Sequence, residues 1–199
     1  MAMARDADAQ KRHVRAAVRA ARADRDAATR DRAAAALSAQ LIALVSEAGA
    51  RRITCYLPTA GEPDPSEFLA WALDHDVEVL LPISLADRNL AWARHSTRIP
   101  EAGRHGIREP VGPRLPSTAA ATADLMLIPA CAVDASGTRL GWGLGYYDRC
   151  LAALDPVPPV YAVVFDEEIL PRLPRDPHDV PVTGAVTPGG IRRFPIETR

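Results

Sequence analysis

The residues best suited to chemistry lie in one glycine-rich segment, residues 137–149, which reads GTRLGWGLGYYDR. Glycines at 141, 143 and 145 alternate with larger residues, and a Tyr-Tyr-Asp-Arg run follows them. Glycine is favoured where a backbone needs unusual dihedral angles or approaches a ligand closely, and exposed amides suit an anion such as phosphate. The spacing matches neither G-x-G-x-x-G nor the Walker loop G-x-x-x-x-G-K-[ST]. The segment therefore predicts an anion-binding loop that opens a helix, with a purely structural turn as the alternative.

A second set of candidate residues is basic and lies near the N-terminus. Lys11 is the only lysine among the 24 lysine and arginine residues. A compact ammonium group binds ligands differently from a planar guanidinium, so this lysine could have been kept for a function. Retention by chance is an equally good explanation. Lys11, Arg15, Arg19 and Arg22 recur at helical spacing and share one face of a predicted helix. On this pattern alone, a solvated charged face is the simpler interpretation.

The bulk composition bounds the class of protein. A chain of 199 residues fits one domain, and a net charge of -1 gives no general affinity for nucleic acid or anionic membranes. No apolar run approaches the roughly 20 residues that span a bilayer, and the charged N-terminal segment lacks the apolar core of a signal peptide. Cys55, Cys131 and Cys150 form no C-x-x-C pair, which predicts reduced thiols rather than a zinc site or disulfides. We therefore expect a cytoplasmic protein.

Hydrophobic periodicity predicts helices and strands in alternation along most of the chain. Helices are predicted at residues 8–22, 29–48, 66–73 and 146–154. Strands are predicted at residues 53–57, 77–81, 90–93, 124–129, 160–165 and 185–187. We expect Gly49 to end the second helix and Ser66 to cap the third. Residues 96–120 predict a long loop, and a loop of that length favours a functional flap.

This alternation predicts an α/β fold with a mainly parallel sheet flanked by helices. In such sheets, ligands bind beyond the carboxyl ends of the strands. The loop at 59–64, the glycine-rich segment and the residues around Asp179 would all lie near such ends. We therefore expect these three segments to converge on one site.

Residues 139–149 resemble the signature of the 5-formyltetrahydrofolate cyclo-ligase family, also called methenyltetrahydrofolate synthetases, which reads approximately R-[LI]-G-x-G-x-G-[YF]-Y-D. Three further blocks agree with the family in order and spacing: KRHVR at 11–15, YLPTAGEPD at 56–64 and HDVPV at 178–182. The segment GIREP at 106–110 also resembles a family block, so the resemblance spans nearly the whole chain. The resemblance implies one domain over residues 1–199, with a helical part at 1–49 on a β/α core. It also implies a three-layer fold like that of sugar-phosphate isomerases and CoA-transferases.

The resemblance implies a reaction as well as a fold. Members of the family use ATP and Mg²⁺ to cyclise 5-formyltetrahydrofolate to 5,10-methenyltetrahydrofolate, and they release ADP and phosphate. Such phosphoryl transfer needs positioning and charge neutralisation more than covalent help. The expected partners are therefore small molecules, ATP and a reduced folate, with no nucleic acid or membrane, and the expected state is a monomer.

The family pattern assigns the basic helix and the glycine-rich segment to ATP. It implies phosphate contacts for Lys11, Arg12 and Arg15, and it implies catalytic roles for Lys11, Arg139 and Tyr146. The remaining ATP contacts implied are Leu140, Gly141, Trp142, Gly143, Leu144, Gly145 and Tyr147, together with Arg139 and Tyr146. Asp148 and Asp179 match magnesium positions, because hard oxygen ligands suit that ion. The alternatives are a carboxylate at a helix start for Asp148 and a turn-forming residue for Asp179.

The family pattern assigns a second group of residues to the folate. Glu62 matches a glutamate whose carboxylate accepts hydrogen bonds from the pterin ring. The other substrate contacts implied are Arg15, Leu57, Trp142, Gly143, Gly145 and Tyr146. Leu57 is equally compatible with a core position at a strand end, and one of the two tyrosines at 146 and 147 is expected to pack in the core.

Four positions depart from the family pattern. Trp142 replaces residues such as Arg, Tyr or Met and could stack on a ligand ring, and Leu144 replaces a smaller or basic residue. Pro65 and the pair Thr183-Gly184 also differ from the expected residues. These departures motivate an alternative, a non-catalytic or weakly active relative that binds nucleotide or folate. A sugar-phosphate isomerase or CoA-transferase-like enzyme is a further alternative, because fold alone does not fix function.

Overall fold

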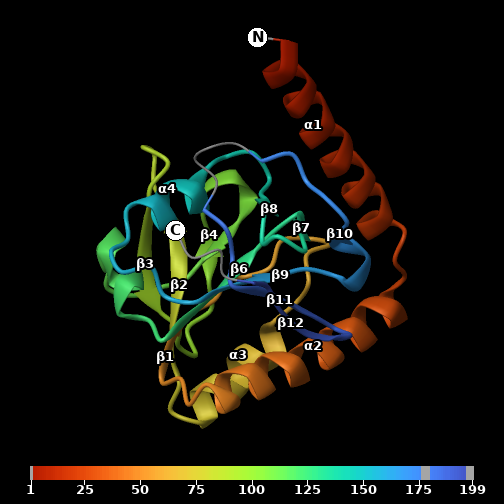
Figure 1. The fold of residues 1–199 in the computed structure, drawn as a ribbon. Helices are drawn as coiled ribbons and strands as arrows, with labels where there is room; N and C mark the ends of the chain where they lie inside the picture. The colour runs from red at the N-terminus through yellow and green to blue at the C-terminus, as the bar shows by residue number, and fades with distance from the viewer. Residues whose placement is uncertain (1, 176–179, 196–199) are drawn as a thin grey trace.

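The computed structural model describes residues 2–175 and 180–195 (Figure 1). Among these residues a seven-stranded sheet has the order β12-β11-β9-β6-β1-β2-β3, in which only the two edge pairs are antiparallel. The predicted α/β fold with a mainly parallel sheet is therefore confirmed. In chain order its strands are β1 (Arg52–Thr54), β2 (Glu78–Ser84), β3 (Leu90–Arg94), β6 (Leu125–Pro129), β9 (Val160–Val163), β11 (Gly184–Thr187) and β12 (Gly190–Arg193).

The two faces of this sheet carry separate hydrophobic cores. Along β6, Leu125 and Leu127 face a core with the helices α2 (Ala27–Glu47) and α3 (Ser66–Asp74), whereas Met126 and Ile128 face the opposite core. That opposite core includes α4 (Tyr146–Ala152) and the short helix η2 (Ser117–Thr122). These four side chains are at most 2% exposed, as expected for a strand covered on both sides. Figure 1 shows α2 and α3 lying together against one side of the sheet.

The helices lie where periodicity predicts them, but their ends differ. The first helix, α1, spans Ala2–Ala23 and so begins six residues earlier than predicted. α2 begins two residues earlier than predicted, because Asp26 caps it by accepting a hydrogen bond from Thr29 N at 2.7 Å. Gly49 follows the C-cap of α2 with a φ of +60°, as a helix-ending glycine should. The prediction that Ser66 caps α3 is wrong, because the N-cap is Pro65 and Ser66 begins the helix.

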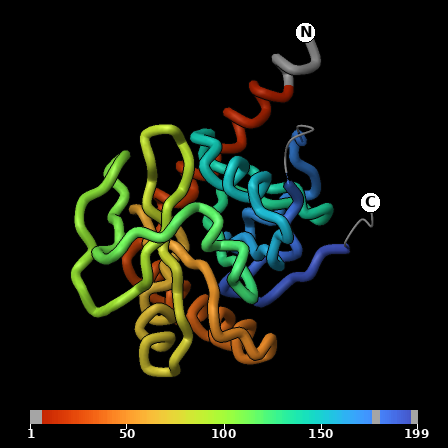
Figure 2. Tube along the Cα trace, turned by 90° about the vertical axis from the view of Figure 1, so that its left-hand side faces the viewer, coloured from red at the N-terminus to blue at the C-terminus, as the bar shows by residue number. Residues whose placement is uncertain are grey.

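Several short elements were not predicted from periodicity. A three-stranded sheet of β10 (Ile169–Leu170), β7 (Ala132–Asp134) and β8 (Arg139–Leu140) follows the carboxyl ends of β6 and β9. Residues 96–120 are not a plain loop, because they contain the hairpin of β4 (Glu101–Ala102) and β5 (Arg108–Glu109), the turn η1 (Arg104–Gly106) and η2. The green segment that contains this hairpin projects to one side of the molecule in Figure 2.

The cysteines lie in the interior of the described structure. All three thiols are free and buried, and burial raises the pKa of Cys55 to about 12 and that of Cys150 to about 11. They therefore stay protonated and unreactive near neutral pH. Within the described ranges, no helix combines the length and the apolar character needed to cross a bilayer.

Candidate functional site

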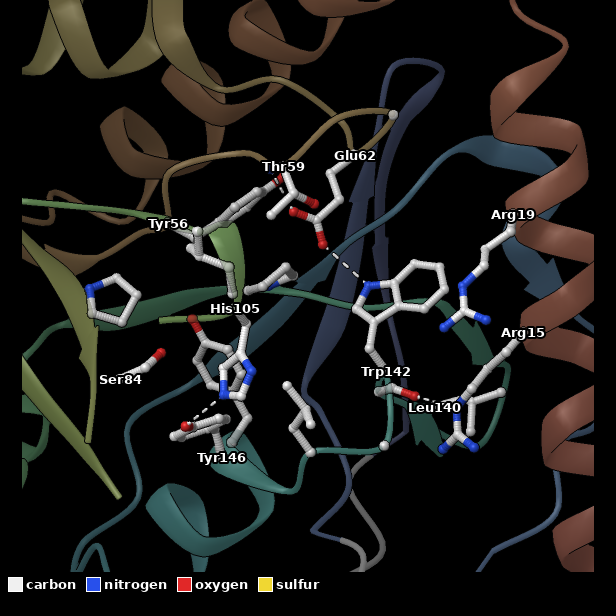
Figure 3. A pocket seen from close by; sticks show the side chains of 18 of the residues that line it. Arg15, Arg19, Tyr56, Thr59, Glu62, Ser84, His105, Leu140, Trp142 and Tyr146 are labelled. Atoms are coloured by element: carbon white, nitrogen blue, oxygen red, sulfur yellow. Dashed lines mark hydrogen bonds between the residues drawn. The ribbon is translucent and has the colours of Figure 1, made fainter. Parts of the chain in front are cut away.

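A cavity of about 890 Å³ lies between α1, the loop after β1, the β4–β5 hairpin and the glycine-rich loop between β8 and α4 (Figure 3). Nearly all the site residues predicted from the sequence line it. They are Lys11, Arg15, Leu57, Glu62, Arg139, Leu140, Gly141, Trp142, Gly143, Leu144, Gly145, Tyr146, Tyr147 and Asp148. Arg12 is exposed on α1 and is not among the lining residues, so its contact with ATP stays a prediction. Asp179 lies outside the described residues.

Helix α1 forms the basic wall of the cavity. Lys11 is 9% exposed and lines the cavity together with Arg15, Arg19 and Arg22, so the basic helix face is not simply solvated. Arg15 Nε donates a hydrogen bond to the carbonyl oxygen of Gly141 at 2.8 Å, which ties the helix to the glycine-rich loop. Several cations facing one hollow attract an anionic ligand.

Arg22 anchors the end of this helix in the protein interior. Its Nε and Nη2 donate to the two carboxylate oxygens of Glu168 at 2.7 and 2.8 Å, and Nη2 also donates to the carbonyl oxygen of Ala130 at 2.9 Å. Burial alone would lower the pKa of Arg22, but the hydrogen bonds and charge of Glu168 outweigh it and leave that pKa above its ordinary value. This buried ion pair fixes the position of α1.

The glycine-rich loop has the backbone that its sequence predicts. Gly143 has a φ of +96°, a conformation that residues with a side chain rarely adopt, and the loop ends at Gly145, which precedes α4. A Cβ atom at Gly143 would lie 3.5 Å from the guanidinium carbon of Arg15. The loop therefore passes directly under the basic wall of α1.

The two residues predicted for phosphate and metal contact each other. Arg139 forms a salt bridge with Asp148, with the arginine side chain 3% exposed and the aspartate side chain 40% exposed. Asp148 therefore reaches the cavity while it neutralises a buried cation. Among the described residues, no group of three or more His, Cys, Asp or Glu could hold a metal ion. Mg²⁺ commonly takes one or two carboxylates plus phosphates and waters, so the single carboxylate of Asp148 fits that ion when a nucleotide is bound.

On the opposite side of the cavity, Glu62 is held by two donors. Its Oε2 accepts a hydrogen bond from Thr59 N at 2.9 Å, and its Oε1 accepts one from Trp142 Nε1 at 3.1 Å (Figure 3). Each carboxylate oxygen has two lone pairs, so each keeps one for a ligand. The geometry leaves Glu62 able to accept a pair of N–H groups from a flat heterocycle.

The two tyrosines that follow the glycines differ in their surroundings. The hydroxyl of Tyr146 donates to the carbonyl oxygen of Leu85 at 3.1 Å and lies 3.2 Å from His105 Nε2. The hydroxyl of Tyr147 is buried, and burial raises its pKa well above the ordinary value. Both tyrosines line the cavity and both pack in the core: Tyr146 is 8% exposed, and Tyr147 is partly buried against the same hydrophobic cluster. The pair therefore does not divide into one core residue and one cavity residue.

The sequence assigned no site role to several of the lining residues, among them Arg19, Arg22 and His105. Arg19 and Arg22 carried a usable signal, because they continue the helical spacing that begins at Lys11. His105 carried none, because it reaches the cavity from the turn of the β4–β5 hairpin, within a segment predicted as a loop. The hairpin also contributes Ile107 and Arg108 to the cavity wall.

Comparisons with known proteins agree with the motifs. A model of the 5-formyltetrahydrofolate cyclo-ligase family matches residues 7–188. A 5-formyltetrahydrofolate cyclo-ligase of Mycolicibacterium smegmatis is 39% identical over 143 residues, which cover 69% of this chain and 74% of that protein. A mouse protein of the same name is 41% identical over 63 residues, which cover 30% of this chain and 31% of that one.

Two solved structures share the fold. The Aquifex aeolicus 5,10-methenyltetrahydrofolate synthetase superposes with a TM-score of 0.79 at 30% identity, covering 95% of this chain and 94% of that one. The Mycoplasma pneumoniae enzyme of that name superposes with a TM-score of 0.71 at 19% identity, covering 89% and 98%. The resemblance inferred from the motifs, and with it the prediction of an enzyme, is confirmed: the chain belongs to the 5-formyltetrahydrofolate cyclo-ligase family.

Proposed function

We propose that this protein uses ATP and Mg²⁺ to cyclise 5-formyltetrahydrofolate to 5,10-methenyltetrahydrofolate, with release of ADP and phosphate. One observation carries the proposal: a single cavity of about 890 Å³ has a basic wall with a glycine-rich loop on one side and the carboxylate of Glu62 on the other. A volume near the upper end of the usual range for ligand sites suits two substrates that must meet.

In the proposed reaction, the formyl oxygen attacks the γ-phosphorus of ATP, and the bond to the ADP oxygen breaks. The nitrogen N10 then attacks the formyl carbon, the bond from that carbon to the phosphate oxygen breaks, and the N10 proton is lost. The protein contributes position and charge, with Lys11 and Arg15 on the phosphates and Glu62 on the pterin ring. We also propose that Arg139 and Tyr146 contact the reacting formyl and phosphoryl groups. Such preorganised cations stabilise charge that develops on a transferring phosphoryl group.

Asp148 would hold the magnesium ion in this proposal. The ion would neutralise phosphate charge and orient the nucleotide when bound. Asp148 already balances the charge of Arg139, so metal binding and this salt bridge draw on the same carboxylate. The role of Asp179, the single domain over residues 1–199, the monomeric state and the cytoplasmic location remain parts of the proposal that rest on the family resemblance.

A direct assay tests the function. Protein mixed with MgATP and 5-formyltetrahydrofolate should produce the methenyl chromophore, and omission of ATP or chelation of Mg²⁺ should abolish it. No chromophore at any ATP or magnesium concentration contradicts the proposal. Tight binding of either ligand without turnover would support the non-catalytic alternative, and ATP-independent turnover of a sugar phosphate would mark the isomerase alternative.

Replacement of Gly143 by alanine should impair ATP binding and lower the free energy of unfolding by about 1–3 kcal/mol, because its φ of +96° strains any residue with a Cβ. Gly49→Ala is a matched control, since Gly49 also has a positive φ (+60°), has open space where a Cβ would lie and is at the end of α2, outside the cavity. Urea unfolding should show comparable losses for both variants, and ATP titration should show a loss only for Gly143→Ala. Normal ATP affinity in Gly143→Ala would contradict the role of the loop.

A further inference from the structure

The indole of Trp142 bridges the two halves of the cavity. It belongs to the glycine-rich loop, and its Nε1 donates a hydrogen bond to Glu62, a residue 80 positions earlier in the chain, at 3.1 Å. The other oxygen of that carboxylate is held by Thr59 N at 2.9 Å, a contact within its own loop. The hydrogen bond from Trp142 therefore links the Glu62 carboxylate to the glycine-rich loop on the opposite side of the cavity.

Two arginines and a small hydrophobic cluster also surround the indole. The guanidinium carbons of Arg19 and Arg22 lie 5.3 and 5.1 Å from its ring centroid, within the range of a cation–π interaction. Arg22 is immobilised by its buried ion pair with Glu168. Trp142 also packs against the small hydrophobic cluster that includes Leu140. Because the indole is supported in this way, its N–H group has a fixed orientation. That orientation in turn fixes the orientation of the Glu62 carboxylate, which accepts its hydrogen bond.

The backbone on both sides of the indole belongs to the proposed phosphate site. The carbonyl oxygen of Gly141 accepts a hydrogen bond from Arg15 at 2.8 Å, and Gly143 has a φ of +96°, which glycine adopts without strain. The indole belongs to this loop. A displacement of the loop therefore also displaces the indole N–H group that donates to Glu62.

We propose that Trp142 is a positioning residue that orients the Glu62 carboxylate for the N–H donors of the folate ring, rather than a surface on which a ligand ring stacks. The inference rests on the proposed function. It assigns the effect of Trp142 to its indole N–H group, because that group donates to Glu62 while two guanidinium groups lie 5.3 and 5.1 Å from the ring centroid. The role of the side chain is thus exerted through Glu62.

Trp142→Phe removes the N–H donor and keeps an aromatic ring over the arginines. We expect calorimetry to show 5-formyltetrahydrofolate binding weakened by about tenfold, in line with the loss of a hydrogen bond to a charged group, with ATP binding changed less than twofold. The KM for folate should rise by a similar factor with little change in kcat. Trp71→Phe is the matched control, because Trp71 stacks on Phe68 and His75 in and beside α3, away from the cavity.

A double-variant cycle separates positioning from direct contact. If Trp142 acts only through Glu62, then Trp142→Phe should have no added effect on folate affinity in a Glu62→Ala background. Additive losses in the double variant would overturn the inference. If the wild-type protein binds folate and Trp142→Phe binds it equally well, the role of Trp142 is overturned but the proposed function is not. Absence of folate binding by the wild-type protein would overturn the proposed function and this inference together.

The contact can also be measured without any ligand. The chain has three tryptophans, so the ¹H–¹⁵N spectrum should show three indole signals, and the one missing in Trp142→Phe belongs to Trp142. In Glu62→Ala that signal should move while the signal of Trp71 stays in place. A Trp142 signal that does not move in Glu62→Ala would overturn the inference, whatever the enzyme's activity.

Discussion

Replacing Glu168 with alanine should lower the free energy of unfolding by about 3–5 kcal/mol, because it leaves the guanidinium of Arg22 buried without its counter-ion. Arg22 is 4% exposed and Glu168 is 2% exposed, and two hydrogen bonds of 2.7 and 2.8 Å join them. Glu168 Oε2 also accepts from Phe165 N at 2.8 Å, so the variant loses a further backbone partner. Urea unfolding at neutral pH measures the loss.

The neighbouring residue gives a matched control for this variant. Glu167 also pairs with an arginine of the N-terminal region, Arg25, but its side chain is 59% exposed. Glu167→Ala should therefore cost no more than about 1 kcal/mol. The double replacement Arg22→Met with Glu168→Leu should be less destabilised than Glu168→Ala, since it leaves no unpaired buried charge. Equal losses for Glu167→Ala and Glu168→Ala would contradict this account of how α1 is anchored.

Lys11→Ala should raise the half-saturating concentration of ATP by about 10- to 100-fold, the range expected when a charged hydrogen bond is lost. The side chain is 9% exposed and lines the cavity beside Arg15. The affinity for folate should change much less. Lys11→Arg should restore only part of the effect, because a planar fork cannot replace a compact ammonium group. Steady-state kinetics with each substrate varied in turn measures both effects.

Glu62→Ala is the reverse arm of this experiment and should raise the KM for folate far more than that for ATP. His13→Ala serves as the control on α1, because its side chain is exposed and does not line the cavity. Equal losses for both substrates in Lys11→Ala and in Glu62→Ala would contradict the division of the cavity into a phosphate side and a pterin side.

Much of the fold was predictable because its signals are local. The buried strand β6 is a continuous apolar run, and Gly49, Gly143 and Gly145 all have the positive φ values that their residue type favours. The basic face of α1 was likewise visible in its helical spacing. What the spacing could not show was whether that face meets solvent or a cavity, because this depends on loops far along the chain.

The parts that escaped prediction depend on distant partners. The sheet β10-β7-β8 is made of strands two or three residues long, too short for an alternating pattern. The hydrogen bond between Trp142 and Glu62 joins two loops 80 positions apart, and nothing near either residue encodes it. The burial of Arg22 follows from Glu168, 146 positions away, whereas its sequence context indicates only a charged helix face.

These long separations bear on the order in which the enzyme matures during its synthesis. The chain leaves the ribosome N-terminus first, so α1 is made before any of its partners. The carbonyl oxygens of Ala130 and Gly141 that accept from Arg22 and Arg15 lie 108 and 126 positions later, and Glu168 lies later still. Helix α1 therefore completes its contacts only after these later residues have been made. A nascent chain interrupted before residue 168 lacks the Glu168 anchor of its basic wall, so we expect ligand binding only from chains that extend past that residue.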